Sequence, residues 1–561
     1  PHRRRDARNA AARRDDDRRG DQEIRGGRAA AGCCEPDGDS GVSEPLLLAL
    51  DAGTGSCRAV VFETGGRQVA MAQREWSHRA MEGVPGSQVF DTATNWRLIS
   101  ECIRAVLQSP GIDTSAIRAV STTSMREGMV LYDKRGREIW ACPNVDSRAG
   151  TEATELVQRG LAEKIYRQGG DWVAITAPAR LRWIKRHEPA MFRDAAHINM
   201  LADWIAYRLS GEFFTDPSIG SSSGMFNLAT RTWSPEIIEI CDMKRELFPP
   251  VLEPGTVAGH VSQGAAADTG LKAGTPVVVG GADTQLGLVG IGVVGEGNFA
   301  VIGGTFWQQT IGLREAMIDP EARLRTLCHA LPGQWMMEGI GFYCGLSMRW
   351  YRDAFCDLEK LEAERTGADA YALMENAAGE VPPGSNGVVA ILSNLMVASR
   401  WIHASPAFVQ FDVGDPARSG RKECIRAIEE AAAYVSYGHL KVIEEVTSRS
   451  CSEVVFTGGA SKGTLWPRVM ADVLGLPVKV PKVKESTALG AAIFAGVGAG
   501  EYPDVATATR AVAGFETTLD PDPSVHARYE ELYAVWKRIY DGQLALVERG
   551  LLKPLWRAAG T

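Results

Sequence analysis

The sequence predicts an α/β protein made of two topologically similar domains. At 561 residues the chain is too long for one hydrophobic core, because single cores stop growing beyond roughly 250–300 residues. Short apolar runs that end in Gly-rich turns alternate with segments of helical spacing, and this order occurs twice along the chain. Each occurrence predicts a mixed sheet covered by helices.

The first occurrence begins with three predicted strands at residues 46–50, 58–63 and 68–75. Residues 95–108 have the apolar spacing of an amphipathic helix, and residues 117–121 have the composition of a further strand. The order strand, strand, strand, helix, strand indicates a mixed sheet with helices on its faces.

The second occurrence has predicted strands at residues 298–302, 335–338 and 453–457, with a long amphipathic helix around residues 425–435. The joint between the two domains is expected near residues 287–297, where Gly recurs and charges are few. Two domains that face each other form a cleft, and small-molecule sites form preferentially in such clefts.

We therefore expect an N-terminal domain over residues 45–288, a C-terminal domain over 297–510 and a helical extension over 511–561. Residues 1–44 have few large apolar side chains, so they cannot bury enough surface to offset their ordering entropy. We predict a disordered tail there. Because the chain starts at Pro1 rather than at Met, we expect this tail to be translated upstream sequence or the edge of a fragment, and we assign it no function.

The overall charge and the cysteine pattern exclude several classes of protein. A formal charge of −8 and a pI of about 5.8 leave no basic footprint for nucleic acid. No apolar run approaches the roughly 20 residues that span a bilayer. The eleven Cys residues form no Cys-x-x-Cys pair and the His spacing suits no metal site, so we predict a cytoplasmic protein without a structural metal.

Two turns have the composition of phosphate-binding loops. In the first, Asp51-Ala52-Gly53-Thr54-Gly55-Ser56, a strand enters a turn whose backbone N–H groups and hydroxyls suit phosphate oxygens. The carboxylate of Asp51 could hold Mg²⁺ through water, because that ion keeps much of its hydration shell. Gly303-Gly304-Thr305 repeats the device in the second half. Either turn taken alone could be an ordinary hairpin.

A third Gly-rich turn, Thr457-Gly458-Gly459-Ala460-Ser461, follows a predicted strand and precedes a predicted helix. Glycine at such positions lets the backbone approach a flat ring such as adenine without a Cβ clash. A tight connection between a strand and a helix is the alternative explanation.

Asp283 is the candidate for proton chemistry, since it follows a strand that ends in Gly280-Gly281-Ala282 and opens a helix toward the predicted cleft. Phosphoryl transfer needs a carboxylate near the attacking hydroxyl, although an Asp at this position is also a common helix N-cap. Arg126 and Glu127 offer a fork of donors and an acceptor for vicinal hydroxyls. A surface ion pair of little energetic value is the alternative for these two residues.

Taken together, these motifs resemble the FGGY carbohydrate kinases, a branch of the actin, hexokinase and Hsp70 superfamily, over about residues 46–557. Several stretches are similar to the autoinducer-2 kinase subfamily in particular. They are Ser124-Met125-Arg126-Glu127-Gly128, Trp140-Ala141-Cys142, Asn144-Val145-Asp146, Gly303-Gly304-Thr305-Phe306-Trp307-Gln308-Gln309, Met348-Arg349-Trp350, Arg352-Asp353-Ala354-Phe355-Cys356, Ser461-Lys462-Gly463 and Leu465-Trp466.

The resemblance implies two actin-like, ribonuclease H-like domains, an ATP cofactor with Mg²⁺ and a small sugar-like substrate. It implies the following roles: first phosphate motif, Asp51, Gly53, Thr54, Gly55 and Ser56; second phosphate motif, Gly304 and Thr305; adenosine motif, Gly458, Gly459 and Ala460; general base, Asp283; substrate contacts, Arg126, Glu127, Thr284 and Gln285. The implied reaction is phosphorylation of linear 4,5-dihydroxypentane-2,3-dione at its terminal hydroxyl, in quorum sensing. Control by the phosphocarrier HPr is a further implication.

The sequence departs from the wider family's pattern at Gly169-Gly170-Asp171, where Thr-Gly-Gln is more usual, at Arg180 in place of Lys and at Ala282 in place of Gly. Two alternatives stay open. One is a kinase of the same family that acts on xylulose, glycerol or a related polyol. The other is a non-catalytic nucleotide switch of the actin or Hsp70 type, which would not require Asp283 or the Arg126-Glu127 pair.

Overall fold

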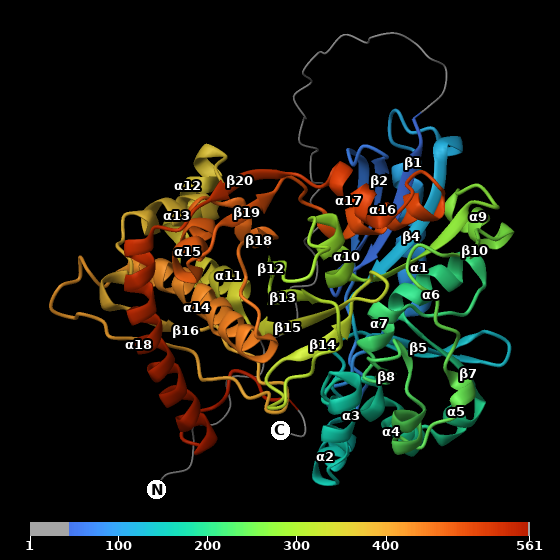
Figure 1. Cartoon of the computed structure of the whole chain (residues 1–561), viewed down its shortest axis with the longest axis horizontal. Coiled ribbons are helices and arrows are strands. Elements are labelled where there is room, and N and C mark those ends of the chain that lie inside the picture. The colour runs from blue at the N-terminus through green and yellow to red at the C-terminus, as the bar shows by residue number, and fades with distance from the viewer. Residues whose placement is uncertain (1–43, 559–561) are drawn as a thin grey trace, which may run out of the picture. The chain divides into compact units, whose positions relative to one another are not determined.

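Two mixed sheets organise residues 44–558, which are the residues that the computed structural model describes (Figure 1). The predicted disordered tail therefore lies outside the described residues, apart from Glu44. The α/β class and the two similar domains expected from the sequence are confirmed, because each sheet collects the strands of one half of the chain.

The first sheet has six strands with β1 near its centre. In spatial order they are β10 (Val257–His260), β11 (Pro276–Ala282), β4 (Ile117–Ser124), β1 (Leu46–Ala52), β2 (Ser56–Glu63) and β3 (Gln68–Glu75). β1 is antiparallel to β2 and parallel to β4, and β4 is parallel to β11. The parallel strands β1, β4 and β11 end at the same edge of the sheet.

The second sheet repeats this plan with one added edge strand. Its order is β14 (Arg325–Cys328), β15 (Trp335–Gly341), β13 (Trp307–Leu313), β12 (Phe299–Gly303), β18 (Val454–Thr457), β19 (Val478–Pro481) and β20 (Phe515–Leu519). β12 is antiparallel to β13 and parallel to β18, as β1 is to β2 and β4. The two Gly-Thr turns therefore follow corresponding strands.

The remaining elements surround the sheets. The small sheets are β6 (Glu138–Cys142) with β5 (Met129–Asp133) and β7 (Ala195–Met200), β8 (Phe226–Asn227) with β9 (Thr232–Trp233), and β16 (Val389–Ile391) with β17 (Ala407–Val409). The helices are α1 (Thr92–Leu107), α2 (Gly150–Gln158), α3 (Leu161–Gly169), α4 (Ala177–His187), α5 (Pro189–Asp194), α6 (Leu201–Ser210), α7 (Pro217–Ser221), α8 (Pro235–Ile240), α9 (Gln263–Thr269), α10 (Asp283–Gly290), α11 (Cys344–Phe355), α12 (Asp357–Thr366), α13 (Ala370–Gly379), α14 (Arg421–Thr447), α15 (Leu465–Leu474), α16 (Ser486–Gly498), α17 (Val505–Val512) and α18 (Pro523–Glu548).

Helices α16 and α17 come late in the sequence but pack with the first sheet. α16 contacts β1, β4 and β11, and α17 packs on α16 and α10 (Figure 1). We call residues 44–290 with 486–512 the first lobe, and residues 299–481 with 515–558 the second lobe. The domain limits expected from the sequence, including an extension over 511–561, stay predictions. In the structure that extension contributes the edge strand β20 as well as α18.

Helix α16 approaches α10 so closely that glycine is required on both sides of the contact. A Cβ on Gly490 would overlap the carbonyl oxygen of Leu286, and a Cβ on Gly290 would overlap the carbonyl oxygen of Ser486. The small residues of α16 thus form a tightly packed helix. Because α10 begins at Asp283, this contact also fixes the start of the helix that carries the candidate base.

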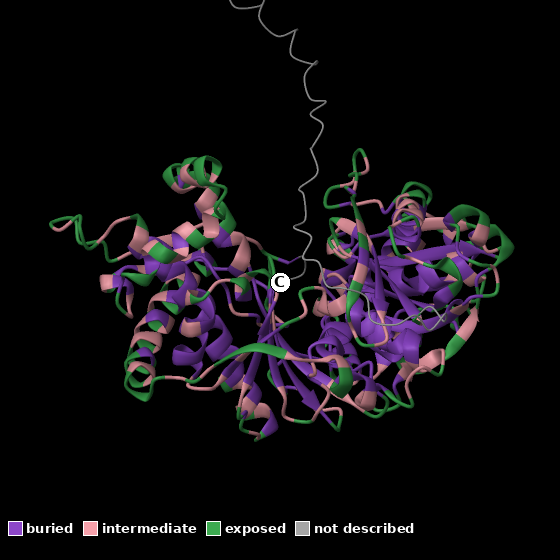
Figure 2. Ribbon diagram, turned by 90° about the horizontal axis from the view of Figure 1, so that it is seen from above, coloured by how far each residue is buried: buried purple, intermediate pink, exposed green. Residues whose placement is uncertain are grey.

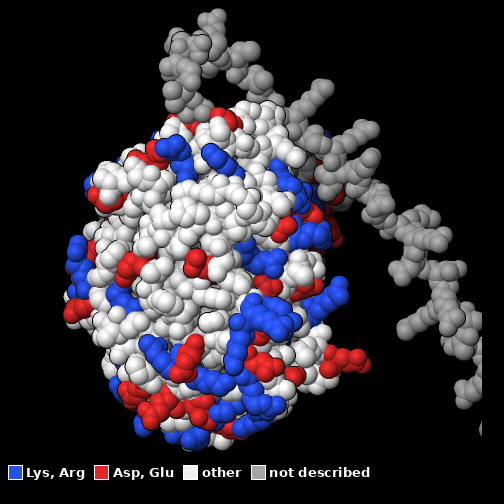
Figure 3. All heavy atoms as spheres, turned by 90° about the vertical axis from the view of Figure 1, so that its right-hand side faces the viewer, with Lys and Arg blue, Asp and Glu red and all other residues white. Residues whose placement is uncertain are grey.

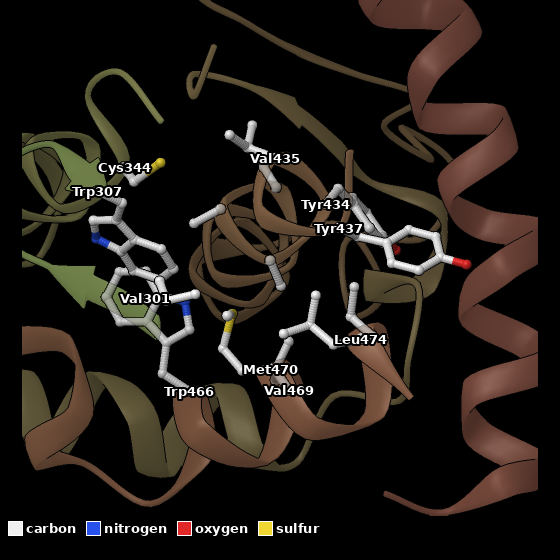
Figure 4. Packing of buried hydrophobic residues seen from close by; sticks show 14 of the residues in the cluster. Val301, Trp307, Cys344, Tyr434, Val435, Tyr437, Trp466, Val469, Met470 and Leu474 are labelled. Carbon is white, nitrogen blue, oxygen red and sulfur yellow. The ribbon is translucent and has the colours of Figure 1, made fainter. Parts of the chain in front are cut away.

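The core of the second lobe is an aromatic and aliphatic cluster between α14, α15 and the second sheet (Figure 4). The ring of Trp307 on β13 lies 5.0 Å from that of Trp466 on α15 and 5.2 Å from that of Phe456 on β18, centroid to centroid. Such large side chains dominate the energetics of a core. Figure 2 shows that buried residues gather in the strands and on the inner faces of helices in both lobes.

The surface seen in Figure 3 carries Lys and Arg side chains interspersed with Asp and Glu. None of the helices in residues 44–558 has the length and apolar character that crossing a bilayer needs.

The contact between α10 and α16 generates a stability prediction. Gly490→Ala should lower the free energy of unfolding by about 1–3 kcal/mol, because overpacking against backbone forces the helices apart. Gly542→Ala in α18 is the matched control, since a Cβ there meets open space. It should be neutral or stabilise by about 0.5–1 kcal/mol. Urea unfolding of both variants would measure the difference, and equal effects would contradict the packing account.

Candidate active site

The turn between β1 and β2 is held from one side by Trp76. The indole Nε1 of Trp76 donates to the carbonyls of Gly53 and Thr54 at 3.1 Å each, and its backbone N–H donates to the Gly55 carbonyl at 3.1 Å. Because a trans peptide points its N–H opposite to its carbonyl, the N–H groups that follow Gly53 and Thr54 point away from Trp76. They form the open edge that a phosphate-binding turn requires.

Asp51 is buried at the end of β1, beside an arginine that it shares with a second carboxylate. Arg58 Nη1 lies 3.4 Å from Asp51 Oδ2 and 3.2 Å from Glu485 Oε2. Burial raises the pKa of Asp51 to about 7; Arg58 opposes this rise, whereas the nearby charges of Asp283 and Glu485 add to it. Asp51 and Asp283 are thus close enough to interact electrostatically.

The Arg126-Glu127 pair is buried, so the surface ion pair considered from the sequence is not what the structure has. The pair lies in a constrained turn after β4. Glu127 has a φ of 60°, which is costly for a residue other than glycine. Arg180 donates to the Glu127 carbonyl, and the Glu127 N–H reaches Ser222 Oγ at 3.4 Å. A Cβ at Gly128 would overlap Leu201. These neighbours fix the backbone of the turn at Glu127 and Gly128.

Asp283 is the first residue of α10, and the helix N-cap is Ala282. Its Oδ1 accepts the Thr284 N–H at 2.6 Å and lies 3.9 Å from Arg126 Nε. Its side chain is 35% exposed, unlike the others of this group. The surrounding protein raises the pKa of Asp283 by desolvation, against the opposing charge of Arg126. Asp283 is therefore an accessible carboxylate beside a fixed cation.

Two residues that the sequence interpretation missed complete this cluster from the second lobe. Glu338 Oε2 and Oε1 accept from Arg126 Nη1 and Nη2 at 3.1 and 3.0 Å. Arg325 donates to Glu338, through Nε at 2.8 Å, and to Glu127, through Nη1 at 2.9 Å. The sequence did contain one signal for these residues, which is the carboxylate of Glu338 inside the apolar strand 335–341. Because buried charges almost always have partners, this carboxylate predicts a nearby cation.

Asp171 belongs to the same cluster and explains part of the departure at Gly169-Gly170-Asp171. Arg325 Nη1 lies 3.2 Å from Asp171 Oδ2. Gly170 has a φ of 75° and its carbonyl accepts the Thr326 N–H at 2.9 Å, so that a Cβ there would overlap β14. Burial raises the pKa of Asp171 to about 6, with Arg325 opposing. The glycine thus lets β14 approach and bring Arg325 to Asp171.

The turns after β12 and β18 line one cavity of about 530 Å³ in the second lobe. This volume lies within the range of small-ligand sites. Its lining residues include Gly303, Gly304, Thr305, Gly345, Met348, Arg349, Glu375, Glu429, Gly459, Ala460, Lys462, Gly463 and Trp466. Two of its glycines lie against other groups: a Cβ at Gly345 would overlap the Gly304 carbonyl, and one at Gly463 would overlap the Glu375 carboxylate. Gly458, next to the lining residue Gly459, has a φ of 94°, and a Cβ there would lie 2.7 Å from the Gly303 carbonyl oxygen.

The charges on the cavity wall come from Arg349, Lys462 and acidic groups. Glu429 is fully buried, and neither of its carboxylate oxygens has a hydrogen-bond partner among residues 44–558. Burial and the nearby Glu375 raise the pKa of Glu429 well above its usual range.

The predicted site residues thus form two groups. Asp51, Arg126, Glu127 and Asp283 interact with one another, whereas Gly304, Thr305, Gly459 and Ala460 line the cavity. Within the first lobe, Thr487 Oγ1 at the start of α16 donates to the Asp283 carbonyl at 3.3 Å.

Two of the predicted substrate contacts are buried. Thr284 is 7% exposed, and the Gln285 amide is fully buried, with its nitrogen donating to the Cys328 carbonyl at 3.2 Å. These two roles stay predictions.

The chain was compared with known proteins. Models of the FGGY family of carbohydrate kinases match it, the N-terminal domain over residues 46–290 and the C-terminal domain over residues 308–499. It is 45% identical to the autoinducer-2 kinase of Klebsiella pneumoniae over 517 residues, 92% of this chain and 97% of that protein. It is 47% identical to the autoinducer-2 kinase of Escherichia coli strain K12 over 521 residues, 92% and 98% of the two chains.

Solved structures share the fold. Xylulose kinase from Rhodospirillum rubrum superposes with a TM-score of 0.77 at 26% identity, over 89% of this chain and 98% of that one. Plasmodium falciparum glycerol kinase with ADP gives a TM-score of 0.77 at 15% identity, with the same coverage, and this likeness concerns the fold alone.

The raised pKa of Asp171 predicts a pH dependence of stability. A carboxyl whose pKa rises on folding stabilises the protein below its unfolded pKa, and that contribution is lost as the pH rises through the folded value of about 6. Between pH 4 and 7 the protein should lose roughly 2–2.5 kcal/mol of unfolding free energy relative to Asp171→Asn. Urea unfolding of both proteins across this range would test it, and parallel stability curves would refute the assignment.

Proposed function

The chain belongs to the FGGY family of carbohydrate kinases, and we propose that within this family it is an autoinducer-2 kinase. Membership makes it an ATP-using phosphotransferase that acts on an alcohol group. The proposed acceptor is the terminal hydroxyl of linear 4,5-dihydroxypentane-2,3-dione. One observation carries the choice of acceptor: identity of 45–47% to autoinducer-2 kinases that extends over 92% of the chain.

ATP would lie with its adenosine in the second-lobe cavity and its phosphates toward the first lobe. The cavity has a suitable size, and Gly459 and Ala460 let the backbone approach a flat base. Thr305 stands at its edge and Lys462 adds a cation. The open N–H edge of the β1–β2 turn, held by Trp76, would bind the phosphates from the other lobe.

Magnesium fits the acidic side of the proposed site. Among residues 44–558, no three His, Cys, Asp or Glu side chains are arranged to hold a metal by themselves. That pattern suits Mg²⁺, which is usually held by one or two carboxylates, water and the substrate's phosphates. Asp51 would hold it, since its carboxylate oxygens are the hard donors that this ion prefers. When bound, the ion would neutralise charge that develops on the transferred phosphoryl group.

Asp283 would accept the proton of the acceptor hydroxyl. The gap of 3.9 Å between its Oδ1 and Arg126 Nε is too long for a direct hydrogen bond. A hydroxyl there could accept from the arginine and donate to the carboxylate. Its oxygen then forms a bond to the γ-phosphorus, the bond from that phosphorus to the ADP oxygen breaks, and the proton passes to Asp283.

We also propose a regulatory partner and a cellular location for the protein. Control by the phosphocarrier HPr rests on the family resemblance alone. A cytoplasmic location is supported by the cysteines, since all nine in residues 44–558 are buried and unpaired by disulfides.

An ADP-release assay across acceptors tests the proposed activity. Purified protein with Mg²⁺ and ATP should release ADP with the highest kcat/KM for dihydroxypentanedione, ahead of xylulose and glycerol. A preference for one of those polyols would replace the proposed acceptor. Release that is independent of every acceptor would support a nucleotide switch and overturn kinase activity for these substrates.

The role of Asp283 gives a mutational prediction. Asp283→Asn should lower kcat by about 10²–10⁴, since general bases contribute factors of that size. Asp357→Asn on α12 is the matched control, because this carboxylate is 78% exposed. It should leave kcat unchanged. A tenfold loss or less in Asp283→Asn, with an unchanged thermal midpoint, would remove Asp283 from this role.

A further inference from the structure

Two charged residues of the second lobe lie directly against the proposed acceptor contacts of the first. Arg325 on β14 and Glu338 on β15 are cross-strand partners. Their side chains are 3% and 0% exposed, so neither can touch a small substrate. What they touch instead are the side chains of Arg126 and Glu127.

Glu338 fixes the orientation of the Arg126 guanidinium. Its two oxygens accept from the two terminal nitrogens of Arg126 at 3.1 and 3.0 Å, a fork that allows one orientation of the planar group. In that orientation the Nε edge faces Asp283 at 3.9 Å. Glu338 therefore determines which edge of the arginine the acceptor hydroxyl and the base would meet.

Arg325 contacts both Glu338 and Glu127, the second proposed acceptor contact. Its Nη1 donates to Glu127 Oε1 at 2.9 Å and to Asp171 Oδ2 at 3.2 Å, while its Nε donates to Glu338 Oε1 at 2.8 Å. One buried guanidinium thus connects three carboxylates from both lobes. The direction of the Glu127 side chain is set by the second lobe, although its backbone belongs to the first.

We infer that Glu338 and Arg325 are positioning residues for the acceptor: Glu338 orients Arg126, and Arg325 orients Glu127. This inference rests on the proposed function. Its consequence is that the first lobe binds the acceptor correctly only while the second lobe holds its two contact residues in place.

Stability alone does not account for this cluster. Buried ion pairs cost so much desolvation that well-packed apolar replacements are often neutral or stabilising. The fork on Arg126 is instead what geometry-dependent chemistry requires, because a misplacement of about 1 Å in a reacting group can cost on the order of 10²-fold in rate.

Glu338→Gln tests the inference, since it keeps the shape of the side chain and removes one acceptor of the fork. With dihydroxypentanedione as the acceptor, kcat/KM should fall by about 10–100-fold. The KM for ATP should change by less than about twofold, because other residues line the nucleotide cavity. A general weakening of the fold would not separate the two substrates in this way.

Glu253→Gln is the matched control. Glu253 Oε2 accepts from Arg231 Nη2 at 3.0 Å, and Arg231 also crosses between the lobes, donating to the His329 carbonyl at 3.2 Å. Glu253→Gln therefore removes a carboxylate from another inter-lobe arginine. It should leave kcat/KM for the acceptor unchanged. An equal loss in both variants would mean that the lobes are merely docked less well, and would overturn the inference.

A double-mutant cycle tests whether Glu338 acts through Arg126. In an Arg126→Gln background, Glu338→Gln should cost less than about twofold more in kcat/KM, because the group that it positions is already gone. Independent, multiplicative losses would overturn the inference. If Glu338→Gln does not fold, Glu338→Asp keeps the charge but shortens the fork. It should still lower kcat/KM for the acceptor by about tenfold, and behaviour like the wild type would count against the inference.

The outcomes for the two proposals can be told apart. If the wild-type protein phosphorylates the acceptor and Glu338→Gln has the same kcat/KM, only the positioning role is refuted. If the wild-type protein phosphorylates none of the acceptors, both the proposed function and the positioning role are refuted.

Discussion

The burial of opposite charges where the two lobes meet is the constraint on which the site depends. Taking an ion out of water costs several kcal/mol, so each buried charge needs a partner with good geometry. Arg126 and Glu127 come from the first lobe, whereas Arg325 and Glu338 come from the second. Arg126 donates to Glu338 and Glu127 accepts from Arg325, while Arg325 and Glu338 also pair with each other. The contact between the lobes is therefore specific at this point. A shift of β14 and β15 along the first lobe would leave charges without partners.

The repeated sheet plan explains why the chemistry is divided between the lobes. In each sheet a central strand, β1 or β12, enters a Gly-Thr turn and pairs in parallel with a strand from later in the chain, β4 or β18. Loops with ligand-binding composition therefore emerge at one edge of each sheet. The first lobe has carboxylates at that edge, with Asp51 on β1 and Asp283 after β11. The second lobe has glycines and a cavity. Helix α10 packs on the second lobe, because its Leu288 shares a buried cluster with Ala300 and Val455.

Local pattern predicted much of this arrangement from the sequence. Strands β1, β12 and β18, and the helix that begins at Asp283, depend on short runs of apolar residues and glycine, and they lie where expected. The partners of Arg126 could not be found in that way. Glu338 interrupts an apolar strand 212 residues further along the chain, and only the pairing of the lobes makes it a neighbour. Burial of the Gln285 amide against the Cys328 carbonyl depends on the same pairing. The packing of α16 on the first sheet could not be predicted from local sequence either. Glycine permits a close approach, but it does not indicate which element approaches.

The balance of charge around the site where the two lobes meet gives a reason for the raised pKa values. Six carboxylates, Asp51, Glu127, Asp171, Asp283, Glu338 and Glu485, face three guanidiniums, Arg58, Arg126 and Arg325. Burial with too few cations raises the pKa values of Asp51, Asp171 and Asp283. A triphosphate arriving alone would worsen this excess, whereas a divalent cation beside Asp51 would offset it and favour the ionised form of both Asp51 and Asp283. Under the proposed function, Asp283 would therefore be most fully ionised when the metal–nucleotide complex is bound. Asp283 could then accept a proton most easily when the phosphoryl donor is present.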